Sequence, residues 1–457
     1  MDYVVNTYRF KKFGKKYFVT TDHGSYCILS EDEFRSFRQH RLDQSLQDKL
    51  EQKELILTHH NFNEAVRLTR ERNSFLFSGT SLHIIVVTLR CNMSCVYCHA
   101  NSRPAGQKQF DMNKETAAKT VDFIFQSPSQ HLSIEFQGGE PLLNWEIVKH
   151  VVEYAKAKSK EHGKSLTLTV VTNLSPMDDE KMEYLLNNDV IICTSLDGPK
   201  ELHDSNRKGT ASSNYDQVAY WIKRLNQEYE KKGKSIRVQA LVTLTRQSLR
   251  FPKEIVDTYL NLRLKVLHLR FLNNLGLAKH SWESIGYSAE EYLDFWHKAV
   301  HCLESLHGEG KDIRERMVVL MSNKIASESD PSYLDLRSPC GAAIGQLAYN
   351  YNGDIYTCDE ARMIGEELFM LGNVSNSEYK DVVTCDKACA VVNASINDQY
   401  ICNTCVYKPY CGVCPVCNYA EQGSVIGKIS QTDRCKIFKA QFDWVVRQKF
   451  INPDSKR

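Results

Sequence analysis

Three cysteines at a fixed spacing are the residues of this chain that suit redox chemistry best. Cys91, Cys95 and Cys98 follow an apolar run, residues 82–88, in the pattern C-x3-C-x2-C. Thiolates are soft ligands that suit iron–sulfur clusters, and three on one loop can hold three corners of a [4Fe–4S] cube. The fourth iron would stay open to bind a small molecule and transfer an electron to it. Zinc sites favour C-x2-C pairs, so the three-residue gap favours iron.

A second motif, Gly138-Gly139-Glu140, follows the predicted strand 132–137, in which apolar and polar residues alternate. Two glycines allow the backbone to approach a ligand closely, and a carboxylate comes directly after them. The alternative interpretation is a simple β-to-α turn with Glu140 in the first turn of the helix.

The two motifs together resemble those of radical S-adenosylmethionine (SAM) enzymes. The resemblance implies that a cluster on the three cysteines reduces bound SAM, giving methionine and a 5′-deoxyadenosyl radical that takes a hydrogen atom from the substrate. It also implies that Tyr97 leans toward the adenine and that Gly138, Gly139 and Glu140 hold the amino group of SAM. Polar residues at later strand ends could contact cofactor or substrate, or could instead cap helices and pair with one another; these are Asn173, Ser195, Asp197 and Arg207.

Ten of the sixteen cysteines lie between Cys340 and Cys435. Cys340 and Cys358 flank an Asn352-Gly353 dipeptide between alternating apolar runs, a pattern that predicts a β-hairpin with the two cysteines at its open end. The further string Cys402, Cys405, Cys411, Cys414, Cys417 and Cys435 resembles the SPASM extension of radical SAM enzymes, which carries two auxiliary [4Fe–4S] clusters. A zinc ribbon is the alternative.

The SPASM resemblance implies one cluster on Cys402, Cys405, Cys411 and Cys435. It implies a second on Cys340, Cys358 and either Cys414 or Cys417, because the position that the usual spacing favours is Pro415. The fourth ligand of that cluster could be Cys385, Cys389, Cys417 or a substrate group. Asp359 matches an aspartate that accepts the substrate proton in sulfatase-maturing relatives; a turn-capping role is the alternative.

Strands and helices alternate between residues 81 and 275, which predicts an α/β fold with a partial (β/α)6 barrel of the TIM type. Chemistry collects at the C-terminal ends of barrel strands, where the Cys91 loop lies. Three short strands and three helices precede the barrel, with a capping box at Ser30–Glu33. We expect residues 1–80 to form a winged-helix-like unit that binds a leader peptide, 81–275 the barrel, 276–335 a helical connector, 336–440 the SPASM domain and 441–457 a tail. A structural cap or a DNA-binding winged helix are the alternatives for the first unit.

Composition excludes several classes of function. The net charge of +2 gives no electrostatic case for nucleic acid or an anionic membrane. No run is long and apolar enough to span a membrane, and the N-terminus does not read as a signal peptide. We therefore expect a cytoplasmic protein whose cysteines bind clusters rather than form disulfides.

A narrower resemblance concerns the strings at residues 82–91, 339–351 and 410–415, which are similar to those of the His-Xaa-Ser system radical maturases. It implies an enzyme that oxidises or cross-links residues of a ribosomally made peptide carrying a leader, with electrons from a flavodoxin- or ferredoxin-type donor. The alternatives are a sulfatase-maturase-like or small-molecule radical SAM enzyme, and a non-catalytic zinc or iron–sulfur interaction protein.

Overall fold

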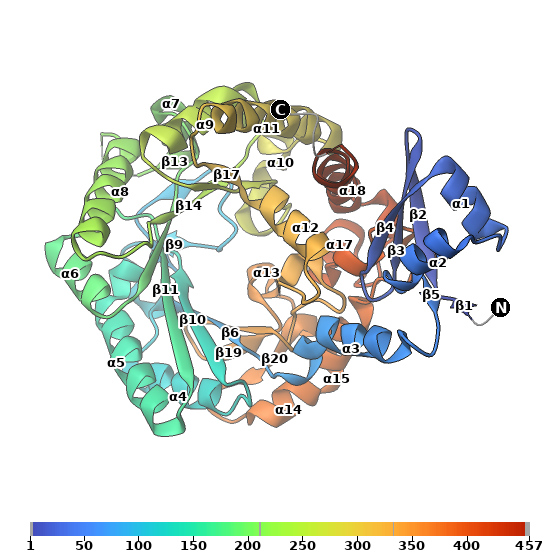
Figure 1. Cartoon of the computed structure of the whole chain (residues 1–457). Helices are drawn as coiled ribbons and strands as arrows, with labels where there is room; N and C mark the ends of the chain where they lie inside the picture. Colours follow the sequence, from blue (N-terminus) through green and yellow to red (C-terminus); the bar gives the residue numbers. More distant parts are fainter. Residues whose placement is uncertain (1–2, 210–211, 332, 453–457) are drawn as a thin grey trace.

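Six parallel strands in sequence order form the curved sheet at the centre of the protein (Figure 1). The computed structural model describes residues 3–209, 212–331 and 333–452. The six strands are β6 (Leu82–Thr88), β10 (His131–Gly138), β11 (Ser165–Thr172), β12 (Ile191–Ser195), β14 (Gln239–Thr243) and β16 (Leu269–Arg270). This order confirms the predicted partial barrel.

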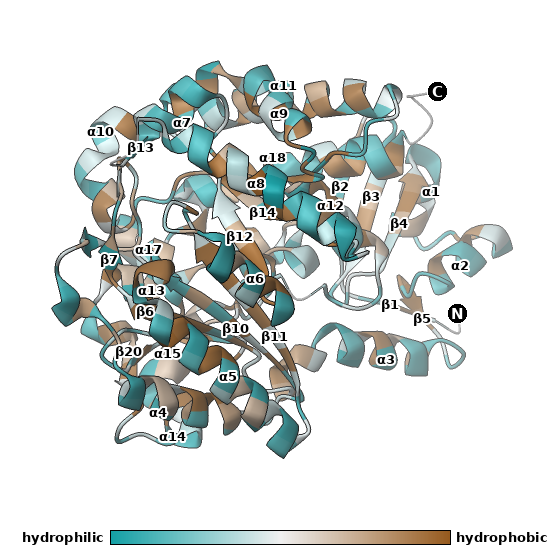
Figure 2. Ribbon diagram, turned by 90° about the vertical axis from the view of Figure 1, so that its left-hand side faces the viewer, coloured by the Kyte–Doolittle hydropathy of each residue, from teal (hydrophilic) through white to brown (hydrophobic). Residues whose placement is uncertain are grey.

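Helices cover the outer face of this sheet, and their outward sides are hydrophilic (Figure 2). They are α4 (Lys114–Phe125), α5 (Trp145–His162), α6 (Asp179–Asn187), α7 (Lys200–Asn206), α8 (Asn214–Lys231) and α9 (Pro252–Asn261). The alternating pattern arises because each strand turns one row of side chains to the helices and the other to the lumen. The predicted sixth strand is interrupted at His268: β15 (Val266–Leu267) pairs with β17 (Arg314–Glu315), and only β16 continues the barrel.

The barrel sheet does not end at β6. The predicted Asn352-Gly353 hairpin is present as β18 (Gln346–Tyr349) and β19 (Asp354–Tyr356), and β18 pairs in parallel with β6. β20 (Met370–Asn373) adds a further antiparallel strand, so the sheet has nine strands. His83 of β6 fixes the joint, since its Nδ1 lies 2.8 Å from the hydroxyl of Tyr349.

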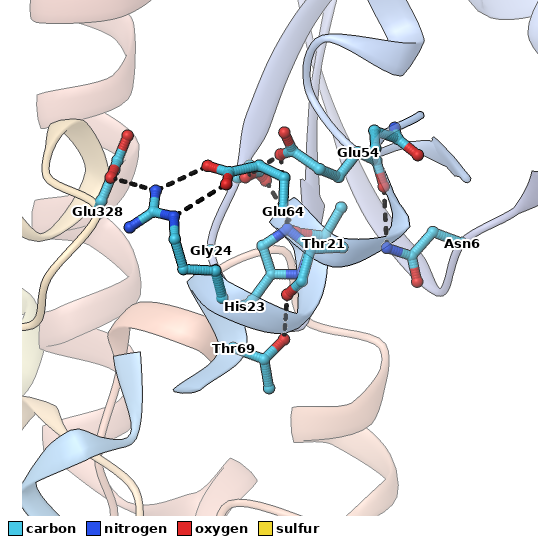
Figure 3. Close-up of polar contacts among 12 residues, drawn as sticks. Asn6, Thr21, His23, Gly24, Glu54, Glu64, Thr69 and Glu328 are labelled. Atoms are coloured by element: carbon cyan, nitrogen blue, oxygen red, sulfur yellow. Dashed lines mark hydrogen bonds and ion pairs between the residues drawn. The ribbon is translucent and has the colours of Figure 1, made fainter. Parts of the chain in front are cut away.

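The N-terminal unit is a three-stranded antiparallel sheet with helices beside it. Its elements are β1 (Val4–Val5), β2 (Tyr8–Phe13), β3 (Lys16–Thr21), β4 (Tyr26–Ser30), α1 (Glu31–Arg38), α2 (Gln44–Glu51), β5 (Ile56–Leu57) and α3 (Phe62–Arg72). The predicted capping box at Ser30 and Glu33 starts α1. Arg67 of α3 pairs with Glu64 and with Glu328 of the connector, at 2.7 Å each, which ties the unit to the rest of the chain (Figure 3).

Helices dominate the remainder of the chain. They are α10 (Trp282–Ile285), α11 (Ala289–Gly308), α12 (Arg316–Ala326), α13 (Asp359–Ile364), α14 (Tyr379–Thr384), α15 (Asp386–Ala394), α16 (Tyr400–Asn403), α17 (Pro415–Gln422) and α18 (Asp433–Val445). The predicted amphipathic helix is α11, and its core residues Tyr292, Phe295 and Trp296 are buried as expected. Within the described ranges, no helix combines the length and the apolar character that crossing a membrane requires.

Candidate functional site

The three-cysteine loop follows the C-terminal end of β6, the end of the strands at which the active sites of barrel enzymes lie. The loop is paired on one side, because β8 (Ser94–Cys95) is antiparallel to β13 (Arg207–Lys208). Asn173, at the end of β11, donates from Nδ2 to Oδ1 of Asn92 at 3.0 Å. Burial raises the pKa of Cys91 to about 12 and that of Cys95 to about 11. Metal ligation must therefore displace protons from both thiols.

The two glycines of the Gly-Gly-Glu segment are required by the cluster loop itself. A Cβ on Gly138 would lie 2.1 Å from the carbonyl oxygen of Thr88, and one on Gly139 would lie 2.3 Å from that of Arg90. The amides of Gly139 and Glu140 donate to these same two carbonyls, at 2.9 and 2.7 Å. The backbone at the end of β10 thus lies in direct contact with the backbone at the start of the loop, with no space for a side chain between them.

Glu140, the next residue, is fully buried and joins two strand ends. Its carboxylate accepts from the hydroxyl of Thr172 at 2.7 Å, from the amide of Asn173 at 2.7 Å and from that of Leu142 at 3.0 Å. Burial raises its pKa to about 7. A contact from Glu140 to the amino group of SAM stays a prediction.

Tyr97, Asp197 and Arg207 form one buried network. The Tyr97 hydroxyl donates to both oxygens of Asp197, at 2.7 and 2.6 Å. Arg207 pairs with Asp197 at 3.3 Å, and its guanidinium lies 5.2 Å from the centre of the Tyr97 ring and 3.8 Å from Sγ of Cys95. Asp197 and Arg207 therefore pair with each other, as one interpretation of the sequence expected. Ser195 lies half-buried at the end of β12.

Sequence reasoning missed the pair that anchors the loop from behind. Arg90, directly before Cys91, forms a two-bond pair with Asp111, at 2.7 and 2.8 Å, and also donates to the carbonyl of Leu143 at 2.8 Å. Thr88 donates to the same aspartate at 2.6 Å. An arginine adjacent to the first cysteine was the available signal, but its partner could not be read from local spacing.

Five cysteines near the C-terminus line one cavity; they are Cys402, Cys405, Cys411, Cys414 and Cys435. Burial, followed by the neighbouring thiols of Cys405, Cys435 and Cys402, raises the pKa of Cys411. Four of the five, all except Cys414, are the residues that the sequence assigned to one auxiliary cluster, so the donor set fits that group.

The second cysteine group combines the hairpin flanks with the start of α17. Cys340, Cys358 and Cys414 share one core cluster. Backbone amides donate to their sulfurs: Ala342 to Cys340 at 3.5 Å, Ala361 to Cys358 at 3.4 Å and Cys417 to Cys414 at 3.4 Å.

Cys417 lies next to Cys414, and its Sγ accepts a hydrogen bond from Nη2 of Arg434 at 3.4 Å. Cys385 and Cys389 lie apart, at the start of α15, and Cys389 is exposed with its thiol directed to the carbonyl of Thr384. The geometry therefore favours Cys414 and Cys417 over Cys385 and Cys389.

No set of three or more His, Cys, Asp or Glu side chains among the described residues is arranged to hold a single metal ion. A cubic cluster needs another geometry, because each cysteine binds its own iron.

Asp359 begins α13, directly after Cys358, and its carboxylate pairs with Arg362 at 2.8 Å. The same helix contacts the radical-type loop: Nδ2 of Asn101 donates to the carbonyl of Met363 at 2.5 Å, and Nη1 of Arg362 donates to that of Ala100 at 3.4 Å. Asp359 thus lies on the element that joins the loop after Cys98 to the Cys358 group.

Known proteins resemble this chain in sequence. Residues 85–232 match the sequence profile of the Radical SAM superfamily. The cysteine-type anaerobic sulfatase-maturating enzyme of Clostridium perfringens is 23% identical over 384 residues, which cover 80% of this chain and 95% of that enzyme. The antilisterial bacteriocin subtilosin biosynthesis protein AlbA of Bacillus subtilis is 22% identical, covering 72% of this chain and 65% of AlbA.

Solved structures share the fold. The sulfatase-maturating enzyme anSMEcpe with bound AdoMet superposes with a TM-score of 0.67 at 20% identity, covering 82% of this chain and 99% of its own. Streptococcus suis SuiB bound to precursor peptide SuiA gives a TM-score of 0.56 at 13% identity, covering 93% and 98%.

The chain therefore contains a radical SAM domain, whose cofactors are SAM and a [4Fe–4S] cluster. It shares its fold with SPASM-type enzymes, and its C-terminal cysteines fit auxiliary clusters. These two expectations from the sequence are confirmed. The resemblance to the His-Xaa-Ser maturases in particular stays a prediction.

Proposed function

We propose that the protein oxidises or cross-links residues of a ribosomally made peptide. When bound, SAM and the cluster supply a 5′-deoxyadenosyl radical able to take a hydrogen atom from a substrate carbon. One observation carries the proposal: α13 connects the loop that follows Cys98 to Cys358 and Asp359. A substrate placed between them would lose a hydrogen atom to the radical on one side. On the other side, Asp359 would take a proton, and a cluster held by Cys358, when bound, would take the electron.

Several of the predicted residues have a defined part in this proposal. Cys91, Cys95 and Cys98 hold the radical cluster, and the Gly138–Glu140 segment and Asn173 shape the SAM side of the loop. Asp359 accepts the substrate proton, a role for which its position beside Cys358 is suited. Residues 1–80 bind the leader peptide by strand addition, the mode that an exposed sheet edge permits. A flavodoxin- or ferredoxin-type protein supplies the first electron.

The relatives support a peptide substrate. One solved neighbour is anSMEcpe with the Cp18Cys peptide, and another is SuiB with its precursor peptide SuiA. The match to the sulfatase-maturating enzyme covers 80% of this chain and 95% of that enzyme. It therefore also favours a second candidate function, the modification of a protein side chain as in sulfatase maturation.

The first test is SAM cleavage. Purified and reconstituted without air, then given SAM and dithionite, the protein is expected to form 5′-deoxyadenosine, detected by mass spectrometry. Cys95→Ala is expected to abolish it. A product that forms equally in this variant would refute the assignment of the loop.

The second test separates the two candidates. A short peptide encoded beside the gene and the Cp18Cys peptide are each incubated with the active protein, and mass changes are followed. Modification of the encoded peptide alone supports the maturase; modification of Cp18Cys alone supports the sulfatase-type activity.

A further inference from the structure

The small N-terminal sheet lies against both segments that carry the cysteines of one predicted auxiliary cluster. Cys402, Cys405 and Cys411 belong to the loop 402–411, and Cys435 lies in the first turn of α18. Strands β2, β3 and β4 stand beside α18 on one side of the molecule (Figure 1). The cluster site is therefore bordered by a part of the chain almost 400 residues away.

The sheet binds the loop through its main chain. The buried hydroxyl of Thr20 in β3 donates to the carbonyl of Val406, the residue after Cys405, at 2.8 Å. Nε of Arg9 in β2 donates to the carbonyl of Asn403, the residue after Cys402, at 2.6 Å. Both carbonyls lie next to predicted cluster ligands, so these bonds fix the backbone from which the sulfurs project.

The loop also binds back to the sheet. The hydroxyl of Tyr410, the residue before Cys411, donates to the carbonyl of Gly24 at 2.8 Å. Gly24 lies in the β3–β4 turn (Figure 3). Arg72 of α3 packs over the Tyr410 ring, 5.3 Å from its centre. Each of the three loop cysteines thus has a neighbour in sequence that is bonded to the N-terminal unit.

One carboxylate joins the sheet, the loop and the helix. Asp443 of α18 pairs with Nζ of Lys11 in β2 at 2.6 Å and accepts from the hydroxyl of Tyr407 in the loop. The Tyr407 ring stacks on Phe442 of α18, with centroids 5.0 Å apart. The helix that carries Cys435 is therefore aligned to the same sheet as the loop.

We propose that the N-terminal sheet is part of the auxiliary-cluster site, with Thr20 and Arg9 as positioning residues for the loop 402–411. Groups that orient metal ligands contribute to metal retention even though they do not touch the metal. The loop has only two short helical turns of its own, so external bonds must fix its backbone. The inference rests on the assignment of Cys402, Cys405, Cys411 and Cys435 to one auxiliary cluster, but neither on SAM cleavage nor on the identity of the peptide.

The test measures how fast auxiliary iron is lost. It uses the full chain with Cys91, Cys95 and Cys98 all replaced by Ala, so that only auxiliary iron is bound. After anaerobic reconstitution, iron release to the chelator ferrozine is followed, together with the EPR spectrum of the reduced clusters. Thr20→Val removes the hydroxyl and keeps the shape.

Thr21→Val is the matched control, because Thr21 is the equally buried neighbour in β3 and its hydroxyl contacts Ser25 within the unit at 3.4 Å. One buried hydrogen bond predicts about five-fold faster iron release for Thr20→Val than for Thr21→Val.

Tyr410→Phe provides a second variant that keeps the ring packing and removes the bond to Gly24. Tyr410→Phe is also expected to release iron faster than Thr21→Val. If Thr20→Val does not fold, Tyr410→Phe alone tests the proposal. Equal release from Tyr410→Phe, Thr21→Val and the parent would overturn the proposal, and so would a parent that binds no iron. If the wild-type chain fails to cleave SAM while its auxiliary iron responds to these variants, the proposed function fails and this inference stands.

Discussion

Gly139 lies where the backbone at the end of β10 contacts the backbone of Leu89 and Arg90, and no space is left for a methyl group. A Cβ there would lie 2.3 Å from a backbone oxygen of the cluster loop, which cannot rotate away as a side chain could. We expect Gly139→Ala to displace the loop and lower the rate of 5′-deoxyadenosine formation about 100-fold, as misplacement of reacting groups by an ångström can do.

Gly106→Ala is the control for this change, because no atom of the described residues lies within 4 Å of a Cβ at Gly106. Both variants are compared by iron content and by 5′-deoxyadenosine yield. Full activity in Gly139→Ala would show that the β10 end does not shape the site.

Asp197 serves the fold through three donors: Tyr97, Asn206 and Arg207. Asp197→Asn leaves a buried guanidinium without its counter-charge, and such a loss costs about 3–5 kcal/mol of unfolding free energy. Urea unfolding of the cluster-free wild-type and Asp197→Asn chains measures this loss of unfolding free energy.

Asp179→Asn, which breaks an exposed pair with Arg224, should cost at most about 1 kcal/mol. If Asp197→Asn lowers the unfolding free energy by less than about 1 kcal/mol but weakens SAM binding, the result would instead support the contact between Asp197 and a ligand that the sequence predicted.

At the scale of elements, the joint between β6 and β18 depends on a histidine that stays neutral. Burial lowers the pKa of His83 to about 3. The unfolded chain binds a proton near pH 6.5 that the folded chain does not, so this residue makes stability fall as pH drops from about 6.5 toward 3, by about 1.4 kcal/mol per unit.

Replacing His83 with Asn should remove about 1.4 kcal/mol of the stability difference between pH 7.5 and 5.5. Urea unfolding at both pH values measures this, with the exposed His60→Asn as control. An unchanged difference in His83→Asn would mean that other groups cause the acid sensitivity.

Elements and motifs differ in how far the sequence could predict them. The six strands, the hairpin at Gly353 and the capping box at Ser30 follow from local patterns, because periodicity and turn chemistry are properties of neighbouring residues. The Arg90–Asp111 pair and the bonds from Thr20 and Arg9 to the cysteine loop could not be predicted, since each joins segments that only the folded chain brings together.

For the whole molecule, the first 80 residues are structurally inseparable from the remainder. Phe13 and Phe18 of the N-terminal sheet belong to the same buried cluster as the barrel core, together with Tyr407 and Phe442. A chain that starts at residue 81 would expose this surface to water, and we expect its soluble yield to be much lower than that of the full chain.

Comparison of soluble yields from parallel expression tests this expectation. A fragment 81–457 that is soluble and binds its full complement of iron would show that the N-terminal unit is an independent module.

The pairing of β6 with β18 has a consequence for synthesis on the ribosome. His83 meets Tyr349, 266 positions later in the chain. Until that partner has emerged, β6 is an unpaired edge made of hydrophobic residues, and such edges promote aggregation. Of the barrel strands that have a neighbour on each side, the strand that carries the cluster loop is thus the last to gain its second neighbour, and a nascent chain stalled before residue 346 would expose it to chaperones.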